Sequence, residues 1–553
     1  MMTDSCGRPA SDPSDAEMLV SAGSGPSRRR LRRSGAVLVF VSLLLSGCFH
    51  VYREVRVAEV FRSVQPTVVR AAVRAHLRDG SVVVYPNGLT VSQTDLVGSG
   101  TRHDALRVTS APAGTISMDS VLGLESYTPS VNAAQSVGTS VLATIGVTVL
   151  TVGGMIAIAC AANPKCFGSC PTVYSTSASG ELLEAELFSY SVAPLLEGRD
   201  VDLLAVQADA NGRVQLEIRN EALETHLINH LELLEVRHAS GEGVVPDARG
   251  RPIVLGARTA PAHARDRSGR DVRALLAMRD SSHFASAAAR LERVTVTDFR
   301  DHIDLTLPRP AGRDSIALVL RLRNTLLNTV LFYDLMLGSA GAQALDWLGT
   351  DLQRIGPAVA LGMWYRSRLG LWVSVEQNGS FAEVERLPDA GPIAWKDVAV
   401  LVPVPPQGDS MRVRLSFVTD EWRIDQVSIA LDARRPTPRS WPAHTTLTSS
   451  GAPSPDALAR LSRPDEAYLE TGPGVTFVVR FETGPLAPGE SRTFLLSSQG
   501  YYTEWVRPDW IRNSTSPAPF APGDSTLLEA LRRWRTVKDE FEQRFHETRI
   551  PVR

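Results

Sequence analysis

Two histidines have the spacing of a metal-binding pair. His226 and His230 stand four residues apart in HLINH, and on a helix this spacing can bring two imidazoles to one zinc ion. Leu227 occupies the position at which such a site needs a glutamate as general base. The flanking residues alternate as in a strand. We therefore expect a strand here, with no metal site, and we expect no cofactor elsewhere in the chain.

A second group of reactive side chains is formed by three cysteines. Cys160, Cys166 and Cys170 lie within CAANPKCFGSC. A zinc site needs four ligands, or three and a water, and the usual C-x-x-C spacing and a nearby histidine are missing here. In an exported protein a disulfide is favoured instead. Three thiols cannot all pair within one chain, so one would stay free or bridge to a partner.

Two further residues are candidates for ligand binding at the rim of a β-sandwich. Asp425 could bind Ca²⁺ or cap a turn, and Trp422 could stack on a sugar ring or fill a core. The sequence shows no G-x-S-x-G elbow, no P-loop and no dinucleotide fingerprint. Catalytic residues therefore cannot be assigned, and a non-catalytic role is favoured.

A further reactive cysteine, Cys48, ends an export signal. Residues 28–33 are five arginines around one leucine, and residues 35–45 carry no charge. A positive segment followed by a short apolar run is typical of a secretory signal. The run is shorter than the roughly 20 apolar residues that a membrane-spanning helix needs. The segment before the arginines is unusually long, so that either Met1 or Met18 could be the start.

The end of this signal, Leu45-Ser46-Gly47-Cys48, resembles the lipobox of bacterial lipoproteins. The resemblance implies cleavage between Gly47 and Cys48 and acylation of the Cys48 thiol, so that membrane lipid would hold the chain. Two or three acyl chains give stable anchoring, whereas one binds only marginally. Phe49 stands where an aspartate would imply retention in the inner membrane. We therefore expect a bacterial envelope protein, at the outer rather than the inner membrane.

The charge balance argues against one class of partner. The 553 residues include 58 Lys and Arg and 60 Asp and Glu, which gives a formal net charge of -2. Nucleic-acid binding requires a clustered positive surface, so no nucleic-acid partner is expected. Five cysteines are too few for a disulfide framework.

The elements that must position these residues are mainly β with some α. In order, we expect a signal peptide (1–47), a tether (48–64), a small β-barrel (65–128), an apolar helical segment (129–165), a β-rich domain (170–323), a helical insertion (324–356), a jelly-roll-like β-sandwich (357–520) and a C-terminal amphipathic helix (523–553).

The barrel and the tail are predicted from local signals. Asp79-Gly80 and Asn87-Gly88 are strong hairpin signals, and five short strands in about 60 residues indicate a strongly bent barrel. The segment resembles barrels of the Src-homology or Sm type. In the tail, Leu527, Leu531 and Trp534 recur at three- and four-residue spacing, which predicts a helix that docks on its own domain.

The helical segment after the barrel leaves two interpretations open. Residues 137–162 are uncharged and rich in Gly, Ala, Ser and Thr. Their length suits a membrane span, and small residues suit close helix packing in lipid. The other interpretation is a buried helix, or two short helices broken at Gly153-Gly154, because glycine weakens a continuous helix.

Alternation predicts the strands of the β-rich part. GRVQLEIRN and HLELLEVRH alternate, and SIALVLRLRN is apolar on both faces near its centre, as in a core strand. FVVRFETGPLAPGESRTFLLSS is expected to form a hairpin. Residues 324–356 break the pattern and predict two helices separated by Gly338 and Gly341.

The region 371–431 carries the second resemblance. LWVSVEQNGSFAEVERL predicts a hairpin with its turn at Asn378-Gly379, and MRVRLSFVTDEWRIDQVSIAL predicts two alternating strands. This pattern resembles the closing strands of jelly-roll sandwiches, including MAM-type and carbohydrate-binding modules. The resemblance implies a sandwich but no activity. If it holds, Leu415 and Phe417 point inward and Arg414 points outward.

Three functions are compatible with these residues. The first is a non-catalytic envelope lipoprotein that binds a glycan or an envelope protein, or supports assembly. The second is an envelope hydrolase that acts on glycans, with a pair of carboxylates in a cleft. The third is a membrane-inserted assembly subunit in which residues 137–162 line an oligomer.

Overall fold

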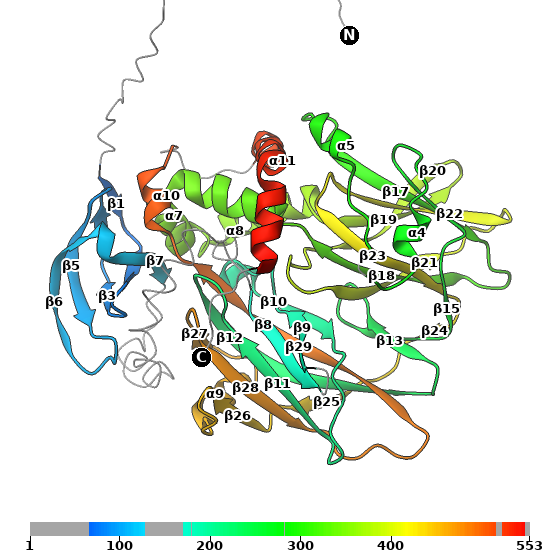
Figure 1. The fold of residues 1–553 in the computed structure, drawn as a ribbon, viewed down its shortest axis with the longest axis horizontal. Coiled ribbons are helices and arrows are strands. Elements are labelled where there is room, and N and C mark those ends of the chain that lie inside the picture. Colours follow the sequence, from blue (N-terminus) through cyan, green and yellow to red (C-terminus); the bar gives the residue numbers. More distant parts are fainter. Residues whose placement is uncertain (1–65, 128–169, 178–179, 281, 516–522, 548–553) are drawn as a thin grey trace, which may run out of the picture. The chain divides into compact units, whose positions relative to one another are not determined.

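The computed structural model describes residues 66–127, 170–177, 180–280, 282–515 and 523–547, with side chains to residue 543. Residues 66–553 form one unit of the chain. The fold is mainly β with a smaller helical part, as the sequence predicts (Figure 1). The lipobox-like Leu45–Cys48 and the apolar residues 137–162 lie outside the described residues. No helix among the described residues is long and apolar enough to cross a membrane.

The first element is a strongly curved antiparallel sheet, a half-barrel, within the range predicted for a small barrel. Its strand order is β1-β4-β5-β3-β2-β7, with β6 paired to β5. Seven strands replace the five expected, and Gly80 and Gly88 both adopt a positive φ. Asp79-Gly80 joins the paired strands β2 and β3 as predicted, but the hairpin predicted at Asn87-Gly88 is wrong because β5 lies between β3 and β4 in the sheet. The elements are β1 (Thr67–Val69), β2 (Ala72–Leu77), β3 (Val82–Tyr85), β4 (Leu89–Val91), β5 (Asp95–His103), β6 (Ser110–Ser117), η1 (Met118–Ser120) and β7 (Val121–Tyr127).

Two five-stranded sheets face each other in a first sandwich. Their inner faces share one apolar core, to which Val214, Leu216 and Ile218 of the predicted alternating strand contribute. One sheet contains β10 (Gly198–Leu203), β29 (Ser491–Glu504), β12 (Glu224–His238), β25 (Arg439–Pro442) and β27 (Leu469–Thr471). The other contains β26 (Thr445–Thr448), β28 (Thr476–Glu482), β11 (Arg213–Arg219), β8 (Thr172–Ser177) and β9 (Gly180–Glu186).

A four-stranded and a five-stranded sheet form the second sandwich. The first of these contains β15 (Arg258–Thr259), β23 (Trp422–Ala430), β18 (Ser315–Asn324) and β21 (Lys396–Pro403). The facing sheet contains β16 (His263–Asp266), β17 (Arg300–Pro308), β22 (Ser410–Val418), β19 (Leu371–Gln377) and β20 (Ser380–Leu387). A small sheet of β13 (Gly243–Pro246), β14 (Pro252–Leu255) and β24 (Ala433–Arg434) packs against β18 and β21.

The strands predicted by alternation exist, but some pair differently from what was expected. Asn378 and Gly379, with φ of 51° and 80°, form the turn between β19 and β20 as predicted. The strands β28 and β29 lie in different sheets of the first sandwich. The predicted hairpin across Pro488-Gly489-Glu490 is therefore wrong: that turn crosses between two facing sheets. Strands from both predicted β regions, 170–323 and 357–520, share sheets in each sandwich.

The inward and outward faces of β22 follow the prediction. Leu415 and Phe417 are fully buried, and the Phe417 ring meets the edge of Phe284 with ring centroids 6.0 Å apart. Arg414 lies on the opposite face, where it donates two hydrogen bonds to Asp304, at 2.6 and 2.8 Å.

A helical layer joins the half-barrel to the sandwiches. The predicted helical insertion forms α6 (Leu327–Thr329), η5 (Val330–Gly338), α7 (Gln343–Asp346) and η6 (Trp347–Asp351) and is followed by α8 (Ile355–Arg368). The η5 and η6 turns are wide π-helical turns. The turn at residues 341–342 contains Gly341, one of the two glycines predicted to separate the helices, whereas α8 was not expected. The remaining helices are η4 (Pro194–Leu196), α4 (Arg273–Leu276), α5 (Ala288–Glu292), α9 (Pro455–Leu461), α10 (Pro508–Arg512) and α11 (Asp524–Glu547).

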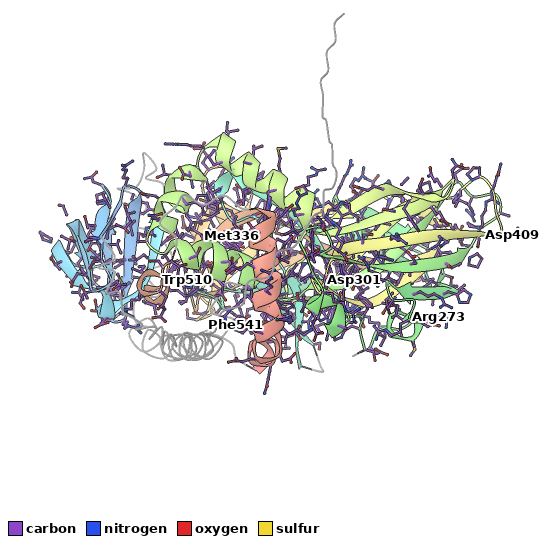
Figure 2. All side chains as sticks on the ribbon, turned by 90° about the horizontal axis from the view of Figure 1, so that it is seen from above. Arg273, Asp301, Met336, Asp409, Trp510 and Phe541 are labelled. Atoms are coloured by element: carbon purple, nitrogen blue, oxygen red, sulfur yellow. The ribbon has the colours of Figure 1, made fainter. Side chains whose placement is uncertain are left out.

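The C-terminal helix docks on this layer, as predicted. Leu527, Leu531 and Trp534 are fully buried in the core that the helices share with the half-barrel. Figure 2 labels Met336 of η5 and Phe541 of α11, both between the half-barrel and the second sandwich.

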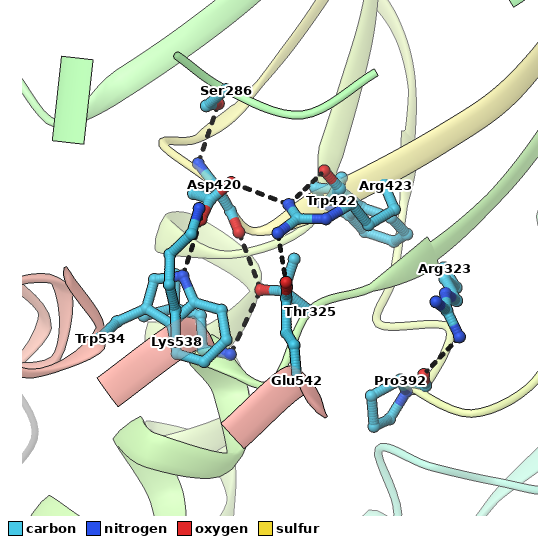
Figure 3. A network of polar contacts seen from close by, with 11 residues as sticks. Ser286, Arg323, Thr325, Pro392, Asp420, Trp422, Arg423, Trp534, Lys538 and Glu542 are labelled. Carbon is cyan, nitrogen blue, oxygen red and sulfur yellow. Dashed lines mark hydrogen bonds and ion pairs between the residues drawn. The ribbon is translucent and has the colours of Figure 1, made fainter. Parts of the chain in front are cut away.

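One buried aspartate fixes α11 to the second sandwich (Figure 3). The Oδ2 atom of Asp420 accepts hydrogen bonds from Trp534 Nε1 at 2.8 Å and Lys538 Nζ at 3.0 Å. Arg423 donates to Oδ1 at 2.7 Å and also bonds Glu542 of α11 at 2.5 Å. The hydroxyl of Thr325 donates to the Asp420 carbonyl at 2.7 Å. The end of β18, strand β23 and helix α11 are therefore joined at the turn between β22 and β23 that contains Asp420.

Candidate functional site

A cavity of about 730 Å³ lies where both sandwiches meet the helical layer. Its lining comes from β9 and the segment after it, from the β18–α6 junction, from η5 and α8, from β19 and β20, and from the loop after β20. The volume falls within the range of about 300–1,000 Å³ that is usual for small-molecule sites.

The loop that closes one side of this cavity is the sequence PDAGPIA, residues 388–394, between β20 and β21. Its proline and glycine residues are typical of a turn. Asn324, at the end of β18, holds the loop: its side-chain Oδ1 accepts the N–H of Ala390 at 2.7 Å, and its backbone N–H donates to Gly391 O at 2.9 Å. The loop is therefore fixed to the second sandwich.

Two carboxylates lie close to Gly391. Its N–H donates to Asp389 at 2.9 Å, and a Cβ added to it would lie 2.4 Å from the carboxyl carbon of Glu186. Glu186 Oε2 also accepts the N–H groups of Ile393 at 2.7 Å and Ala394 at 3.3 Å. Gly391 has a φ of 80°, a conformation that favours glycine. Only glycine lets the loop pass this close to the buried carboxylate.

The cavity lining contains two amide atoms with no partner among the described residues. These atoms are Nδ2 of Asn324 and Oδ1 of Asn328. The Asn324 residue is only 2% exposed. Asn328 uses its Nδ2 to donate to Asp389 at 2.6 Å. A buried polar atom without a partner costs about 1–3 kcal/mol. The lining therefore offers one donor and one acceptor that a polar ligand can satisfy.

The Asp389 carboxyl is a further polar group of the cavity lining, and its pKa is shifted. Burial raises the pKa of the Asp389 carboxyl, against the opposing effect of its hydrogen bonds from Gly391 and Asn328. Burial also raises the pKa of the neighbouring Glu421 to about 8, and the charge of Asp389 adds to this shift. A raised pKa widens the pH range in which a carboxyl group is protonated, and a protonated carboxyl can donate as well as accept hydrogen bonds.

Aromatic side chains supply much of the remaining lining. The Tyr333 and Tyr502 hydroxyls lie 3.3 Å apart, and Arg300 lies 4.0 Å from the centre of the Trp372 ring. Rings with a polar end combine apolar contact with hydrogen bonding. The aromatic lining residues are Tyr190, Phe332, Tyr333, Tyr365, Trp372 and Tyr502.

The residues predicted as a sandwich-rim site are not at a rim. Trp422 is fully buried in the core of the second sandwich. Asp425 is 2% exposed and pairs with Arg321 at 3.0 Å. The rim prediction is therefore corrected, because β23 is an inner strand of its sheet, between β15 and β18.

The predicted histidine and cysteine sites have different outcomes. His226 and His230 both lie in strand β12, as alternation predicts, and His226 is buried against Glu224 at 2.7 Å. Cys170 lines the cavity with a free, buried thiol, and burial raises its pKa. Cys160 and Cys166 lie outside the described residues, so a disulfide between them stays a prediction.

Of the residues that line the cavity, the sequence analysis singled out Cys170 but missed the polar groups. Glu186, Asn324, Asn328 and Asp389 come from three segments spread over about 200 positions, so no spacing motif joins them all. The turn signal of residues 388–394 was visible in the sequence, but a turn signal alone does not indicate a site.

No protein-family model and no curated protein matches this chain. Among solved structures, the chain is similar to the C-terminal CBM6 of a laminarinase from Zobellia galactanivorans, with 10% identity over 36% of this chain and 98% of that one and a TM-score of 0.13. Allantoicase matches with 10% identity over 50% of this chain and 95% of its own, and with a TM-score of 0.16. A cycloalternan-forming enzyme from Listeria monocytogenes, in complex with a pentasaccharide, matches with 13% identity over 64% and 30% and a TM-score of 0.16. These neighbours include carbohydrate-binding and carbohydrate-converting proteins, but such TM-scores carry no argument about this chain.

Proposed function

We propose that this chain is an envelope-anchored protein that binds a short carbohydrate in the cavity between its two sandwiches. The observation that carries the proposal is the pair of unpartnered amide atoms, on Asn324 and Asn328, in a lining of tyrosines and carboxyl groups.

The chemistry of the lining suits a ligand rich in hydroxyl groups. Each hydroxyl is both donor and acceptor, so neighbouring hydroxyls can satisfy Asn324 Nδ2 and Asn328 Oδ1 together. The Asp389 carboxyl adds donor or acceptor capacity beside them. Tyrosine rings offer apolar contact to the C–H faces of a sugar ring. An ion of either sign fits less well, because the lining includes both the arginines Arg366 and Arg386 and the carboxylates.

The anchoring part of the proposal rests on the lipobox-like Leu45–Cys48. Acylation of Cys48 would hold the chain at the membrane, with the outer membrane as the expected location. Metabolic labelling with a palmitate analogue should mark the wild-type protein but not Cys48→Ser. Equal labelling of both proteins would contradict acylation at this residue.

The cavity is tested by thermal shift of the purified protein against a panel of envelope and plant glycans. We expect at least one oligosaccharide to stabilise the wild type, and Asn328→Ala to lose this stabilisation. Asn211→Ala is the matched control because Asn211 is an exposed turn residue outside the cavity lining. If no glycan stabilises the wild type, or if Asn328→Ala responds as Asn211→Ala does, the carbohydrate proposal fails.

One observation favours glycan hydrolysis as a second candidate. The carboxyl groups of Glu186 and Asp389 both lie close to Gly391, and the raised pKa of Asp389 suits a general acid. A bound oligosaccharide should then be cleaved by the wild type, with new reducing ends, and remain intact with Glu186→Gln or Asp389→Asn. Binding without cleavage by the wild type would support the binding function and exclude this second candidate.

A further inference from the structure

Helix α8 shows an unusual exposed face. Ile355 is 73% exposed, Val359 50% and Met363 66%, and their four-residue spacing puts them in one row along the helix. Gly356 and Ala360, beside this row, are also exposed. A surface helix normally turns charged and polar side chains to solvent. Here about two turns present only uncharged residues.

The opposite side of α8 accounts for the helix itself. Ala358 and Leu361 are buried in the core shared with the half-barrel, and Leu361 and Tyr365 line the cavity. The exposed row is therefore not needed for folding. These apolar side chains can be shielded from water only when a partner covers them. Such an exposed apolar row indicates an interaction surface.

Arginines stand at both ends of the row. Arg354, just before the helix, has a side chain that is 68% exposed and reaches Asp351 only at 3.9 Å. Arg366 is exposed and lies three residues after Met363, on the same face. Arginines beside an apolar row can pair with anionic lipid headgroups when the row lies against a membrane surface.

The position of the expected anchor allows this contact. The stretch from Cys48 to β1 can span at most about 65–70 Å when fully extended. An acylated Cys48 would therefore keep the folded unit close to the bilayer, where weak contacts act at a high effective concentration.

We propose that the exposed face of α8, centred on Ile355, Val359 and Met363, lies against the membrane surface as a second contact beside the lipid anchor. The inference rests on the proposed anchoring at Cys48 for its proximity to the bilayer. Arg366 belongs both to this face and to the lining of the cavity. The membrane would therefore lie beside the rim of the cavity.

The test is site-specific photocrosslinking of the full chain in its native envelope. A benzophenone amino acid is placed at position 359, and a matched control is placed at Val108, which is 79% exposed in the half-barrel. We expect phospholipid adducts at 359 in clear excess over those at 108. Met363→Glu should lower the lipid adducts at 359 about tenfold, because the change puts a charge into the apolar contact.

Two outcomes would overturn the inference. Adducts at 359 that consist only of protein would mean that a protein partner or a second copy covers α8. Adducts at 359 no more abundant than at 108 would mean that the face is bare. The same experiment with Cys48→Ser separates this inference from the anchor: lipid adducts that persist there support α8 contact even if palmitate labelling shows no acylation.

Discussion

Replacing Asp420 should detach the C-terminal helix from the second sandwich. Asp420 is fully buried and accepts hydrogen bonds from Arg423, Trp534 and Lys538. In Asp420→Ala, the Arg423 and Lys538 charges lose this carboxylate, and among the described side chains only Arg423 has a second acidic partner, Glu542. The indole N–H of Trp534 loses its acceptor.

The magnitude follows from burial and backbone conformation. Removing one partner of a buried ion pair costs about 3–5 kcal/mol. Asp420 also has a φ of 63°, in the left-handed region that asparagine and aspartate tolerate better than other residues. Asp420→Asn keeps this tolerance and one acceptor for Trp534 but loses the charge. We expect a loss of about 4–5 kcal/mol for Asp420→Ala and about 2–3 kcal/mol for Asp420→Asn.

Hydrogen exchange combined with guanidinium denaturation measures both effects. We expect peptides from α11 to lose protection first in Asp420→Ala, while the sheets of the first sandwich keep theirs. Asp420→Asn should fall between Asp420→Ala and the wild type. Wild-type exchange of α11 in both variants, with an unchanged denaturation midpoint, would refute the assignment of Asp420 as the residue that fixes this helix.

Three further predictions concern the second sandwich and the cavity loop. Phe417→Ala should lower the free energy of unfolding by about 3–5 kcal/mol. Arg414→Ala should lower it by about 1 kcal/mol because the Arg414–Asp304 ion pair is partly exposed. Chemical denaturation compares the two losses, and a larger loss for Arg414→Ala would mean that the polar face of β22 is the inner one. The pKa of Glu421 rises from 4.5 to about 8 in the fold, so the stability from its protonated form is complete below pH 4.5 and is lost as the pH rises to about 8. In Glu421→Gln the melting temperature should therefore fall less over this pH range than in the wild type. The same slope of melting temperature against pH in both proteins would speak against the raised pKa. Gly391→Ala should abolish ligand binding in calorimetry. Gly379 has the same φ of 80° but nothing within 4 Å of an added Cβ, so Gly379→Ala should lower the free energy of unfolding by only about 1 kcal/mol and bind the ligand normally. Equal binding by both variants would show that the tight passage of the loop is not required.

Local patterns in the sequence predicted the elements well. The alternation of Val214, Leu216 and Ile218 and the turn at Asn378-Gly379 are properties of a few consecutive residues, and the structure confirms both. The periodic apolar residues of the tail predicted a docked helix for the same reason. Alternation shows which residues share a face, so the inward side of β22 was also predictable.

Partnership between distant segments was not predictable in the same way. The turn after β28 looks like a hairpin turn, but β28 pairs with β11 and β26, and β29 pairs with β10 and β12. The rim assignment of Trp422 failed because alternation shows which residues share a face but not whether their strand lies inside the sheet or at its edge. The cavity combines Glu186 with Asp389, and nothing near either residue in the sequence indicates the other.

Calorimetric titration of the full chain with the glycan that gives the largest thermal shift tests the central claim most directly. If the cavity binds this ligand through its unpartnered amide atoms, Asn328→Ala should lose about 1–2 kcal/mol of binding free energy, or about tenfold in Kd, while Asn211→Ala keeps the wild-type Kd. The same Kd for all three proteins would contradict the claim, because the glycan would then bind elsewhere.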